Sequence, residues 1–552
     1  MSQPKTADMT PIIDLTSVTG TGPKRSSLPI YVDLLPPCNS ACPAGENIQG
    51  WLAYAQAGNF RAAWEALVRD NPMPAIHGRV CYHPCESHCN REALDSTVSI
   101  HAIERFLGDR ALENGWTLPI DLPPSGKRVL VVGAGPSGLS AAYHLTRLGH
   151  TVEIHEAGPL PGGMLHFGIP AYRLPRDVLM GEIARIEKLG VKIVLNHRVD
   201  DLLAEQAAGR FDAVFVAIGA HLSKHIEIPA RDAAQVFDAV SLLHDVETGA
   251  APLLGRRVVV YGGGNTAMDA ARTAKRLGAS DAVIVYRRDR AHMSAHGFEA
   301  DEALAEGIKI KWLTTIKMID AGALTVERMR IDADGRPQPT GEIETLPADA
   351  VVLALGQDAD SGFLKQIPAI QFRADGTMLV GPNMMTGAPG IFGGGDLIPS
   401  ERSVTIATGH GKKAAASIDA WLRGALSKPV TKHRGVDFSM LRLPIYSDAE
   451  PSRQTELAAQ ARAQSFAEVV GGLSERAALH EAKRCLSCGN CYECDNCLAA
   501  CPETAIIKLG PSLGYRVDAA LCTGCAVCFE QCPCHAIEMI ADPANTAAPT
   551  AG

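Results

Sequence analysis

RVLVVGAGPSGLSAAYHLTRLGHTVEIHEAGPLPGGML, residues 128–165, predicts a strand, a glycine-rich turn, a helix and a second strand in direct succession. The turn has the pattern G-x-G-x-x-G, and an acidic residue, Glu156, stands 18 positions after the last glycine, Gly138 (156 − 138). The first glycine permits the tight turn, the second lets the backbone approach a pyrophosphate, and the third lets helix and strand pack closely. An ordinary loop is the alternative, which the flanking elements disfavour. The predicted dinucleotide-binding residues are Gly133, Gly135, Pro136, Ser137, Gly138 and Gly163, with Glu156 accepting hydrogen bonds from ribose hydroxyls.

A second glycine-rich turn follows the apolar run 256–261. It reads G-x-G-x-x-A and predicts nucleotide binding by Gly262, Gly264, Asn265, Thr266 and Ala267. The next predicted strand, 282–285, leads to Arg287 and Arg288, where an NAD-binding loop usually carries an acid. Because guanidinium groups hold phosphate oxygens bidentately, this pair favours NADP(H) over NAD(H), and a solvated basic turn is the alternative.

A third motif, Gly390–Asp396, precedes a predicted helix over 404–422. A strand that ends in Gly-Asp is weak by itself, but its order after two dinucleotide loops is informative. Asp396 is therefore predicted to bind a flavin ribityl chain, with the helix N-terminus facing the edge of the ring.

Two copies of the pattern C-x2-C-x2-C-x3-C-P occur near the C-terminus. This is the run of bacterial two-cluster ferredoxins, in which the fourth cysteine of each run binds the other cluster. The pattern predicts two [4Fe-4S] clusters, held by Cys491, Cys494, Cys497 and Cys532 and by Cys522, Cys525, Cys528 and Cys501.

The remaining cysteines indicate further metal binding near the N-terminus. Cys38, Cys42, Cys81, Cys85 and Cys89 have the loop spacing that suits iron–sulfur ligation, with zinc as the alternative. Five thiolates cannot complete two four-iron clusters, whereas Cys485 and Cys488 lie outside the ferredoxin pattern and Cys534 has no assigned role. We therefore hypothesise that Cys485 and Cys488 reach back to Cys38 and Cys89.

Composition limits the class of protein. The chain has 552 residues, 46% hydrophobic and 20% charged, which is enough for several buried cores. A net charge of −9 without a strongly basic block argues against nucleic acid as a partner. We expect no signal peptide and no membrane span, and sixteen cysteines in two groups favour metal binding in a reducing cytoplasm over disulfides.

Residues 35–425 resemble the glutamate synthase small-subunit family. The resemblance rests on CPAGENI, GRVC, CESHC, VGAGPSGLSAA, FGIPAYRLP, GGGNTAMDAAR, VYRR and IFGGGD. It implies FAD at the first glycine-rich loop, NADP(H) at the second, and two N-terminal [4Fe-4S] clusters. By position it places Cys42, Cys81 and Cys85 on one of these clusters with Glu104 as fourth ligand, for which a helix ion pair is the alternative. Two features depart from the family: the spacing Cys81-x3-Cys85 is shorter, and the element R-C-L-x-C-G stands at 484–489 instead of at the N-terminus.

The predicted fold class is α/β with two Rossmann-like domains, an N-terminal α-helical iron–sulfur domain and a C-terminal α+β ferredoxin domain. The expected boundaries are a disordered or extended tail over 1–30, the iron–sulfur domain over 31–120, the FAD domain over 121–250 and 345–425, the NAD(P)H domain over 251–344, a helical linker over 426–484 and the ferredoxin domain over 485–552.

The predicted function is electron transfer by an NAD(P)H-dependent flavo-iron–sulfur oxidoreductase subunit with four [4Fe-4S] clusters, in which hydride transfer needs no catalytic side chain. The expected partner in a hetero-oligomer is ferredoxin or a catalytic subunit such as a 2-oxoacid:ferredoxin oxidoreductase, an aldehyde oxidoreductase or a glutamate synthase large subunit. The alternative is a non-enzymatic electron-wire or assembly subunit with a vestigial nucleotide site.

Overall fold

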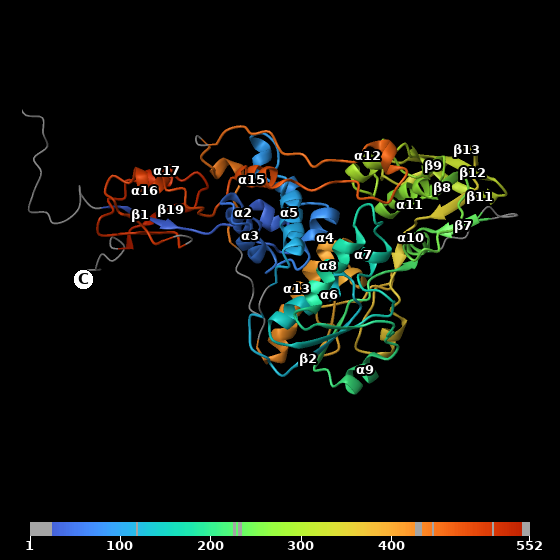
Figure 1. The fold of residues 1–552 in the computed structure, drawn as a ribbon, viewed down its shortest axis with the longest axis horizontal. Coiled ribbons are helices and arrows are strands. Elements are labelled where there is room, and N and C mark those ends of the chain that lie inside the picture. The colour runs from blue at the N-terminus through green and yellow to red at the C-terminus, as the bar shows by residue number, and fades with distance from the viewer. Residues whose placement is uncertain are drawn as a thin grey trace, which may run out of the picture.

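The computed structural model describes residues 25–117, 120–224, 228–229, 235–425, 433–443, 446–510 and 513–543. Figure 1 shows a cysteine-rich C-terminal part at one end, a group of N-terminal helices beside it, and two α/β units beyond these helices. Within the described residues, no helix combines the length and the apolar character needed to cross a bilayer.

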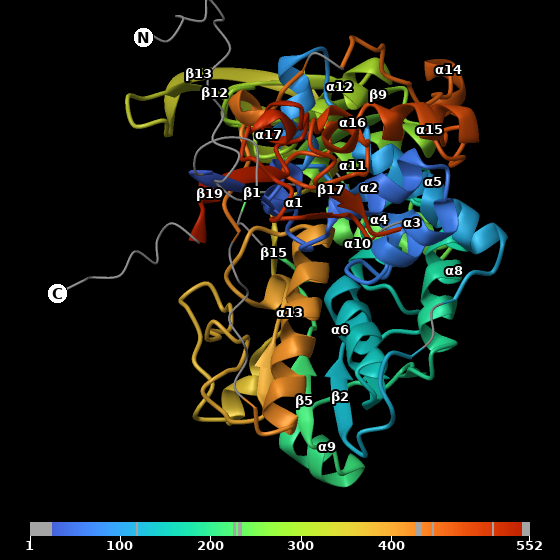
Figure 2. The same cartoon turned by 90° about the vertical axis from the view of Figure 1, so that its left-hand side faces the viewer.

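The first α/β unit contains a five-stranded, all-parallel sheet in the order β16, β5, β2, β3, β4. Parallel strands covered on both faces require continuous apolar runs, and residues 129–132 and 213–216 are buried throughout. Helices α6 and α13 lie side by side against this sheet (Figure 2). The elements are β2 (Arg128–Val132), β3 (Thr151–His155), β4 (Lys192–Val194), β5 (Ala213–Val216), β16 (Ile391–Gly393), α6 (Pro136–Arg147), α7 (Met164–Phe167), α8 (Arg176–Glu187), α9 (Leu202–Gly209) and α13 (Val404–Leu422), with the 3-10 turns η3 (Gly362–Gln366) and η4 (Gly395–Leu397).

The second α/β unit contains another five-stranded parallel sheet, in the order β10, β9, β8, β14, β7. Because β14 pairs with both β8 and β7, the predicted domain boundaries at 250/251 and 344/345 are wrong, and this unit takes in residues 235–250 and 345–353 as well. Its elements are β7 (Gln235–Asp238), β8 (Arg257–Tyr261), β9 (Asp281–Val285), β10 (Lys309–Lys311), β14 (Ala350–Leu353), α10 (Ala239–Glu247), α11 (Asn265–Arg276) and α12 (Gly297–Ala305).

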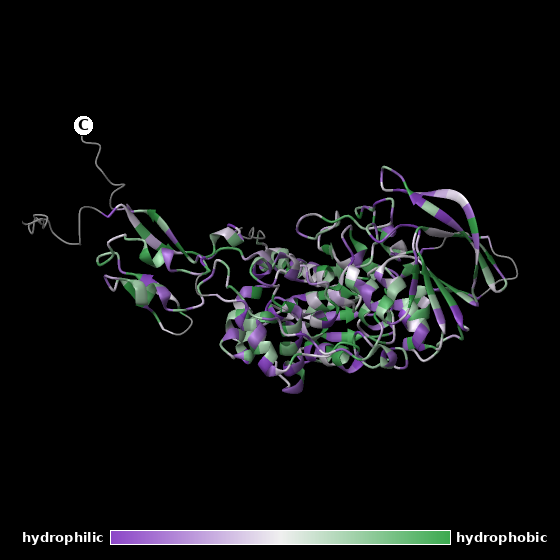
Figure 3. Ribbon diagram, turned by 90° about the horizontal axis from the view of Figure 1, so that it is seen from above, coloured by the Kyte–Doolittle hydropathy of each residue, from purple (hydrophilic) through white to green (hydrophobic). Residues whose placement is uncertain are grey.

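An antiparallel sheet that the sequence analysis did not anticipate is inserted into the second unit. It consists of β11 (Thr314–Asp320), β12 (Ala323–Ile331) and β13 (Pro337–Pro347), and a short ribbon of β6 (Leu222–Ser223) and β15 (Gln357–Asp358) lies at the junction of the two units. Along β12, Leu324 and Val326 are buried and pack against β8 and β14. Figure 3 shows hydrophobic and hydrophilic residues next to each other along the strands at the right-hand end of the molecule.

The N-terminal helices share one core with a helix from the far end of the chain. They are α1 (Pro37–Ala41), α2 (Ile48–Gln56), α3 (Phe60–Leu67), α4 (Pro74–Val80) and α5 (Ile100–Glu113), with η1 (Glu86–His88) and η2 (Asn90–Ala93). Helix α15 (Glu475–Lys483) packs on α2 and α5 and buries Ala478 and Ala482 in their apolar core. The segment that leads into Cys485 is therefore part of the N-terminal helical group.

The expected helical linker over 426–484 is mostly irregular. Besides α15 it contains only η5 (Phe438–Met440) and α14 (Ala459–Arg462) among the described residues. The alanine-rich composition favours helix, but tertiary contacts override this weak preference. Val469 donates a backbone hydrogen bond to Tyr172, and Glu468 forms ion pairs with Arg79 and Arg105.

The C-terminal part contains two antiparallel strand pairs. Strands β17 (Ile506–Lys508) and β18 (Tyr515–Val517) form one pair, and β19 (Ile537–Ala541) pairs with β1 (Ser27–Tyr31). The short helices are α16 (Asn496–Ala500) and α17 (Val527–Glu530). The predicted tail over 1–30 thus ends in a strand that completes the C-terminal part, while residues 1–24 lie outside the described residues.

Candidate functional site

The first glycine-rich turn links β2 to α6. Gly133 has φ +103°, and a Cβ atom there would lie 2.6 Å from the Ala217 carbonyl oxygen. A Cβ atom at Gly138 would lie 2.0 Å from the Gly133 oxygen, so the helix and strand are in closest contact at this position. Gly135, by contrast, faces open space, and Gly163 packs against it. The three glycines thus have the geometry of a dinucleotide turn, with room above the second one.

The polar groups around this turn leave a donor available for a ligand. The two carboxylate oxygens of Glu156 accept hydrogen bonds from the backbone N–H groups of Ala134 and Gly158, both at 2.8 Å. Ser137 is buried, and its hydroxyl has no hydrogen-bond partner among the described residues. Because buried hydroxyls are normally paired, Ser137 fits a group that donates to a bound phosphate.

A cavity of about 730 Å³ lies between the two α/β units. Asp396, in η4, is half-buried at this cavity, and desolvation raises its pKa to about 6 although Arg402 opposes the shift. The volume of this cavity is in the range of pockets that hold cofactors. Of the predicted nucleotide-binding residues, the cavity is bordered by Gly133, Gly135, Pro136, Ser137, Glu156, Gly163, Asp396, Asn265 and Thr266.

The second glycine-rich turn links β8 to α11. A Cβ atom at Gly262 would lie 2.2 Å from the Ala354 carbonyl oxygen, and Ala267 is fully buried where the third glycine would stand. Gly264 caps the N-terminus of α11. The side-chain amide of Asn265 is already engaged: Nδ2 donates to the hydroxyl of Tyr82 at 2.6 Å, and Oδ1 accepts from a backbone N–H at 3.0 Å.

Arg287 and Arg288 follow β9, next to this turn but outside the cavity lining. Within the described ranges, neither forms an ion pair, and the buried Nε of Arg288 has no hydrogen-bond partner. Two unpaired guanidinium groups at this position fit a phosphate ester.

A buried ion-pair group joins the two units. Arg173, from the loop before α8, bonds Asp269 of α11 at 2.7 Å and Glu299 of α12 at 2.6 Å. Sequence reasoning assigned no role to Arg173, although it lies in the family motif FGIPAYRLP. Arg173 and Asp269 both border the cavity, so this contact fixes the two nucleotide units against each other.

Four cysteines from three distant segments border one small cavity. Cys38 lies in α1, Cys89 lies between η1 and η2, and Cys485 and Cys488 follow α15. Burial raises the pKa of Cys38, and the thiolates of the other three raise it further. Asn90 donates to the sulfur of Cys488 at 3.5 Å. This is the grouping that the reach-back hypothesis requires, and four converging thiols suit a cluster or a zinc ion.

Cys42, Cys81 and Cys85 form a second group beside two buried carboxylates. Glu104 accepts from Asn71 at 2.6 Å, and the same amide donates to Glu46 at 3.0 Å. Burial raises the pKa of Glu104, and the charge of Glu46 raises it further. Within the described residues Glu104 forms no ion pair, which speaks against the helix ion-pair alternative. Sequence reasoning missed Glu46, whose only signal is its place just after Cys42-Pro-Ala-Gly.

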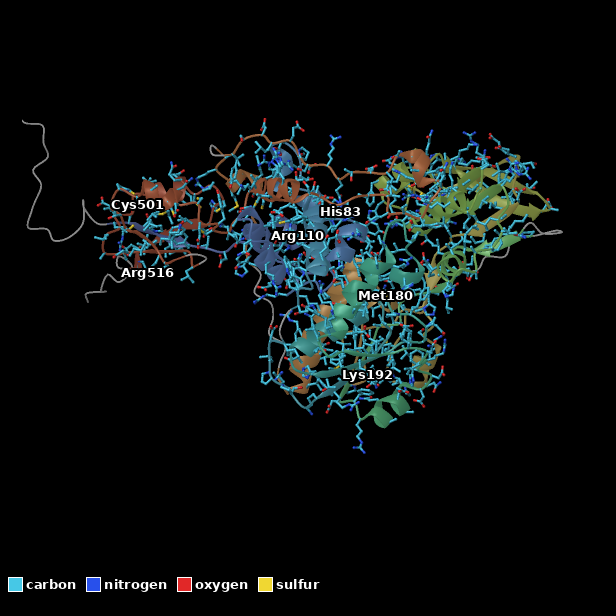
Figure 4. The ribbon with its side chains drawn as sticks, viewed as in Figure 1. His83, Arg110, Met180, Lys192, Cys501 and Arg516 are labelled. Atoms are coloured by element: carbon cyan, nitrogen blue, oxygen red, sulfur yellow. The ribbon has the colours of Figure 1, made fainter. Side chains whose placement is uncertain are left out.

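This second group lies at the wall of the large cavity. Thr405, in the first turn of α13, donates to the sulfur of Cys81 at 3.1 Å. Val80 and Tyr82, on either side of Cys81, border the cavity. The backbone therefore brings the half-buried Cys81 to the wall of this cavity. His83 lies close by, where the N-terminal helices meet the second α/β unit (Figure 4).

The C-terminal cysteines form the two groups that the ferredoxin pattern predicts. Cys501, Cys522, Cys525 and Cys528 border one small cavity. Burial raises the pKa of Cys491 to about 11, and the neighbouring thiolates of Cys497, Cys532 and Cys494 raise it as well. Cys534 is buried with its sulfur 3.8 Å from that of Cys532. Figure 4 shows Cys501 at the end of the molecule far from the nucleotide units.

The fold and these sites define a class: an oxidoreductase with two dinucleotide units and iron–sulfur ligand groups. The family model described as pyridine nucleotide-disulphide oxidoreductase matches residues 127–411, and the model described as dihydropyrimidine dehydrogenase domain II, 4Fe-4S cluster, matches residues 34–116. The chain belongs to the pyridine nucleotide-disulphide oxidoreductase family.

Three relatives are similar to this chain over most of its length. The NADP(+)-dependent formate dehydrogenase subunit beta of Moorella thermoacetica is 37% identical over 499 residues, which cover 82% of this chain and 70% of that protein. The NADPH-Fe(3+) oxidoreductase subunit beta of Geobacter sulfurreducens is 32% identical over 82% of this chain and 75% of its own length. The glutamate synthase [NADPH] small chain of Escherichia coli is 32% identical over 70% of this chain and 89% of its own. The resemblance to the glutamate synthase small-subunit family is thus confirmed, and so is the prediction of a flavin- and pyridine-nucleotide-linked iron–sulfur oxidoreductase subunit that transfers electrons.

Proposed function

We propose that this chain exchanges electrons between NADP(H) and a catalytic partner subunit, through FAD and four [4Fe-4S] clusters. The observation that carries the proposal is the single cavity bordered by both glycine-rich turns and by the residues on either side of Cys81. When bound, FAD converts a hydride, which carries two electrons, into single electrons that iron–sulfur clusters accept.

The chain's own residues bind and orient these groups. The open backbone at Gly135 and the hydroxyl of Ser137 hold the FAD pyrophosphate, and Glu156 binds the adenosine ribose beside the backbone N–H groups it already accepts from. Arg287 and Arg288 hold the 2′-phosphate of NADP(H). Val80 and Tyr82 border the cavity, so little more than the Cys81 loop separates the nucleotide from the thiols.

The ligand groups suggest a continuous path from the nucleotide to the far end of the molecule. Cys42, Cys81, Cys85 and Glu104 hold the cluster at the cavity wall, with Glu46 as a rival fourth ligand. Cys38, Cys89, Cys485 and Cys488 hold the next. Only two residues separate Cys488 from Cys491, which belongs to the first C-terminal group, so the Cα atoms of these two cysteines lie within about 11 Å of each other.

The partner is proposed to be a catalytic oxidoreductase subunit that docks near the C-terminal part. The relative from Moorella thermoacetica is named as the beta subunit of a formate dehydrogenase, which favours a formate-oxidising partner over a 2-oxoacid:ferredoxin oxidoreductase, an aldehyde oxidoreductase or a glutamate synthase large subunit. Ferredoxin remains the alternative acceptor.

Anaerobic mixing of the purified protein with NADPH tests the proposal. We expect the flavin absorbance to bleach, and NADH at equal concentration to act more slowly. Replacing Arg287 and Arg288 by alanine should raise the KM for NADPH without affecting that for NADH, because only the 2′-phosphate is lost as a contact. An unchanged flavin spectrum with both nucleotides would instead favour a non-enzymatic electron wire.

A further inference from the structure

We propose that Tyr82 is a positioning residue for the nicotinamide nucleotide and that it acts through Asn265 and His296. The inference rests on the proposal that the second glycine-rich turn binds NADP(H). Tyr82 comes from the cysteine loop after α4, in the shortened gap between Cys81 and Cys85, yet it borders the large cavity. A residue of the iron–sulfur region thus takes part in the nucleotide site.

The hydroxyl of Tyr82 fixes the side chain that begins α11. Asn265 donates from Nδ2 to this hydroxyl at 2.6 Å, and its Oδ1 accepts from the backbone N–H of His296 at 3.0 Å. Both ends of the amide are therefore occupied by the protein itself. Asn265 stands immediately after the glycines, so holding its side chain also holds the first turn of α11, whose backbone N–H groups have no partner within the helix.

The ring of Tyr82 fixes the other side of the same turn. It stacks on His296 with the ring centroids 3.7 Å apart and the planes inclined by 20°. His296 is the residue that precedes α12, and the next residue but one, Phe298, stacks on His83 at 5.5 Å. His83 in turn stacks on His101 of α5 at 4.1 Å. A column of aromatic rings therefore connects the N-terminal helices to the second α/β unit.

Tyr82 presents one hydrogen-bond acceptor and one flat ring face to the second α/β unit. Removing the Tyr82 contacts should make the turn more mobile in the free protein. Part of the binding free energy of the nucleotide is then used to order the turn, so the affinity falls.

The experiment uses the complete holoprotein under anaerobic conditions. NADP+ affinity is measured by calorimetry, and KM and kcat are measured with NADPH, for the wild type and for Tyr82→Phe. We expect the Kd for NADP+ and the KM for NADPH to rise about three- to tenfold, the range that one net hydrogen bond is worth, with kcat and the flavin and iron contents unchanged.

Tyr143→Phe is the matched control. Its hydroxyl also crosses between parts of the fold, donating to the Val68 carbonyl at 2.8 Å, but Tyr143 does not border the cavity. A double-mutant cycle adds a second check. If Tyr82 acts through Asn265, then Tyr82→Phe should weaken NADP+ binding little further in a protein that already carries Asn265→Ala.

The outcomes separate this inference from the proposed function. If the wild type does not bind NADP+, the proposed nucleotide site fails. If the wild type binds NADP+ and Tyr82→Phe binds it as well as Tyr143→Phe does, only the role of Tyr82 is overturned. Tighter binding by Tyr82→Phe would overturn it too, because the contact would then obstruct the nucleotide, and so would fully additive effects in the cycle.

Discussion

The two cysteine-rich regions of this protein are assembled in different ways. In the C-terminal part, eight cysteines come from two short runs, 491–502 and 522–533, and each group combines three cysteines of one run with the fourth of the other. In the N-terminal part, Cys38 and Cys89 meet Cys485 and Cys488 across roughly four hundred residues. Nothing local brings these last two cysteines there.

The difference shows what a split ligand group demands of the fold. Helix α15 must pack on α2 and α5 before Cys485 can reach its place. Arg484, with 1% of its side chain exposed, fastens the end of that helix by bonds to Asp95 and Glu481, both at 3.0 Å. The C-terminal groups need only two neighbouring runs to fold onto each other, whereas this N-terminal group needs segments from both ends of the chain to meet.

The largest effect is expected from Cys485→Ala combined with Cys488→Ala. If these residues complete the N-terminal group, iron should fall by about four atoms per chain, while the electron paramagnetic resonance of the ferredoxin-type clusters persists. Cys534→Ala is the control and should leave the iron content unchanged. Unchanged iron in the double variant, or loss of the C-terminal signals with it, would contradict the split assignment.

Arg484→Ala should destabilise the protein by about 3–5 kcal/mol, because the fully buried carboxylate of Glu481 loses its cationic partner. Urea unfolding followed by tryptophan fluorescence measures this. Arg476→Ala, on the exposed face of α15, is the control and should shift the free energy of unfolding by less than about 0.5 kcal/mol. Equal effects for the two variants would mean that α15 does not depend on its buried end.

Gly489→Ala tests the joint between the two regions. Gly489 has φ +77°, and a Cβ atom there would lie 2.5 Å from Val436 and 2.6 Å from Leu34. We expect a loss of about 1–3 kcal/mol from overpacking, added to the backbone strain of about 1 kcal/mol that positive φ imposes. Gly514→Ala has nearly the same φ, +69°, in open space, and so should show the strain alone. Indistinguishable unfolding curves would show that the joint is loosely packed.

The smallest expected effect is a pH dependence of stability that arises at the contact between the nucleotide units and not in either cysteine-rich region. Burial raises the pKa of Glu299 to about 7 from the ordinary 4.5, although Arg173 opposes the shift. The folded state therefore binds the proton more tightly than the unfolded state does, so this contribution to stability is present at low pH and is lost as the pH rises from about 4.5 through 7. Glu299→Gln should flatten the decline in the free energy of unfolding between pH 5 and pH 8.

Glu342→Gln, on the exposed hairpin of β13, serves as the comparison for that measurement. It should leave the slope as in the wild type. If Glu299→Gln does not change the slope of the free energy of unfolding against pH, the pH dependence arises elsewhere in the fold.

Much of the fold follows from local patterns. The strands and helices around both glycine-rich turns lie where the apolar periodicity predicts them, and the helix over 404–422 has the predicted bounds. The errors lie where distant strands choose partners. The apolar sequence of β14 would suit the sheet of either α/β unit, and only its pairing with β7 and β8 assigns it to the second unit. Likewise, β1 lies at the end of the segment predicted to be a tail, and its partner, β19, lies at the other end of the chain.

The sequence by itself determined the chemistry: two glycine-rich turns, an acid or a pair of arginines after them, and cysteine runs whose spacing matches iron–sulfur ligation. These signals are short-range, since a turn or a four-residue spacing is set by the backbone between its ends. Tertiary structure alone decided that α15 carries Cys485 to Cys38, that Glu46 joins Glu104, and that Tyr82 meets Asn265. Such contacts depend on which apolar faces pack together, and many faces of similar composition could have served.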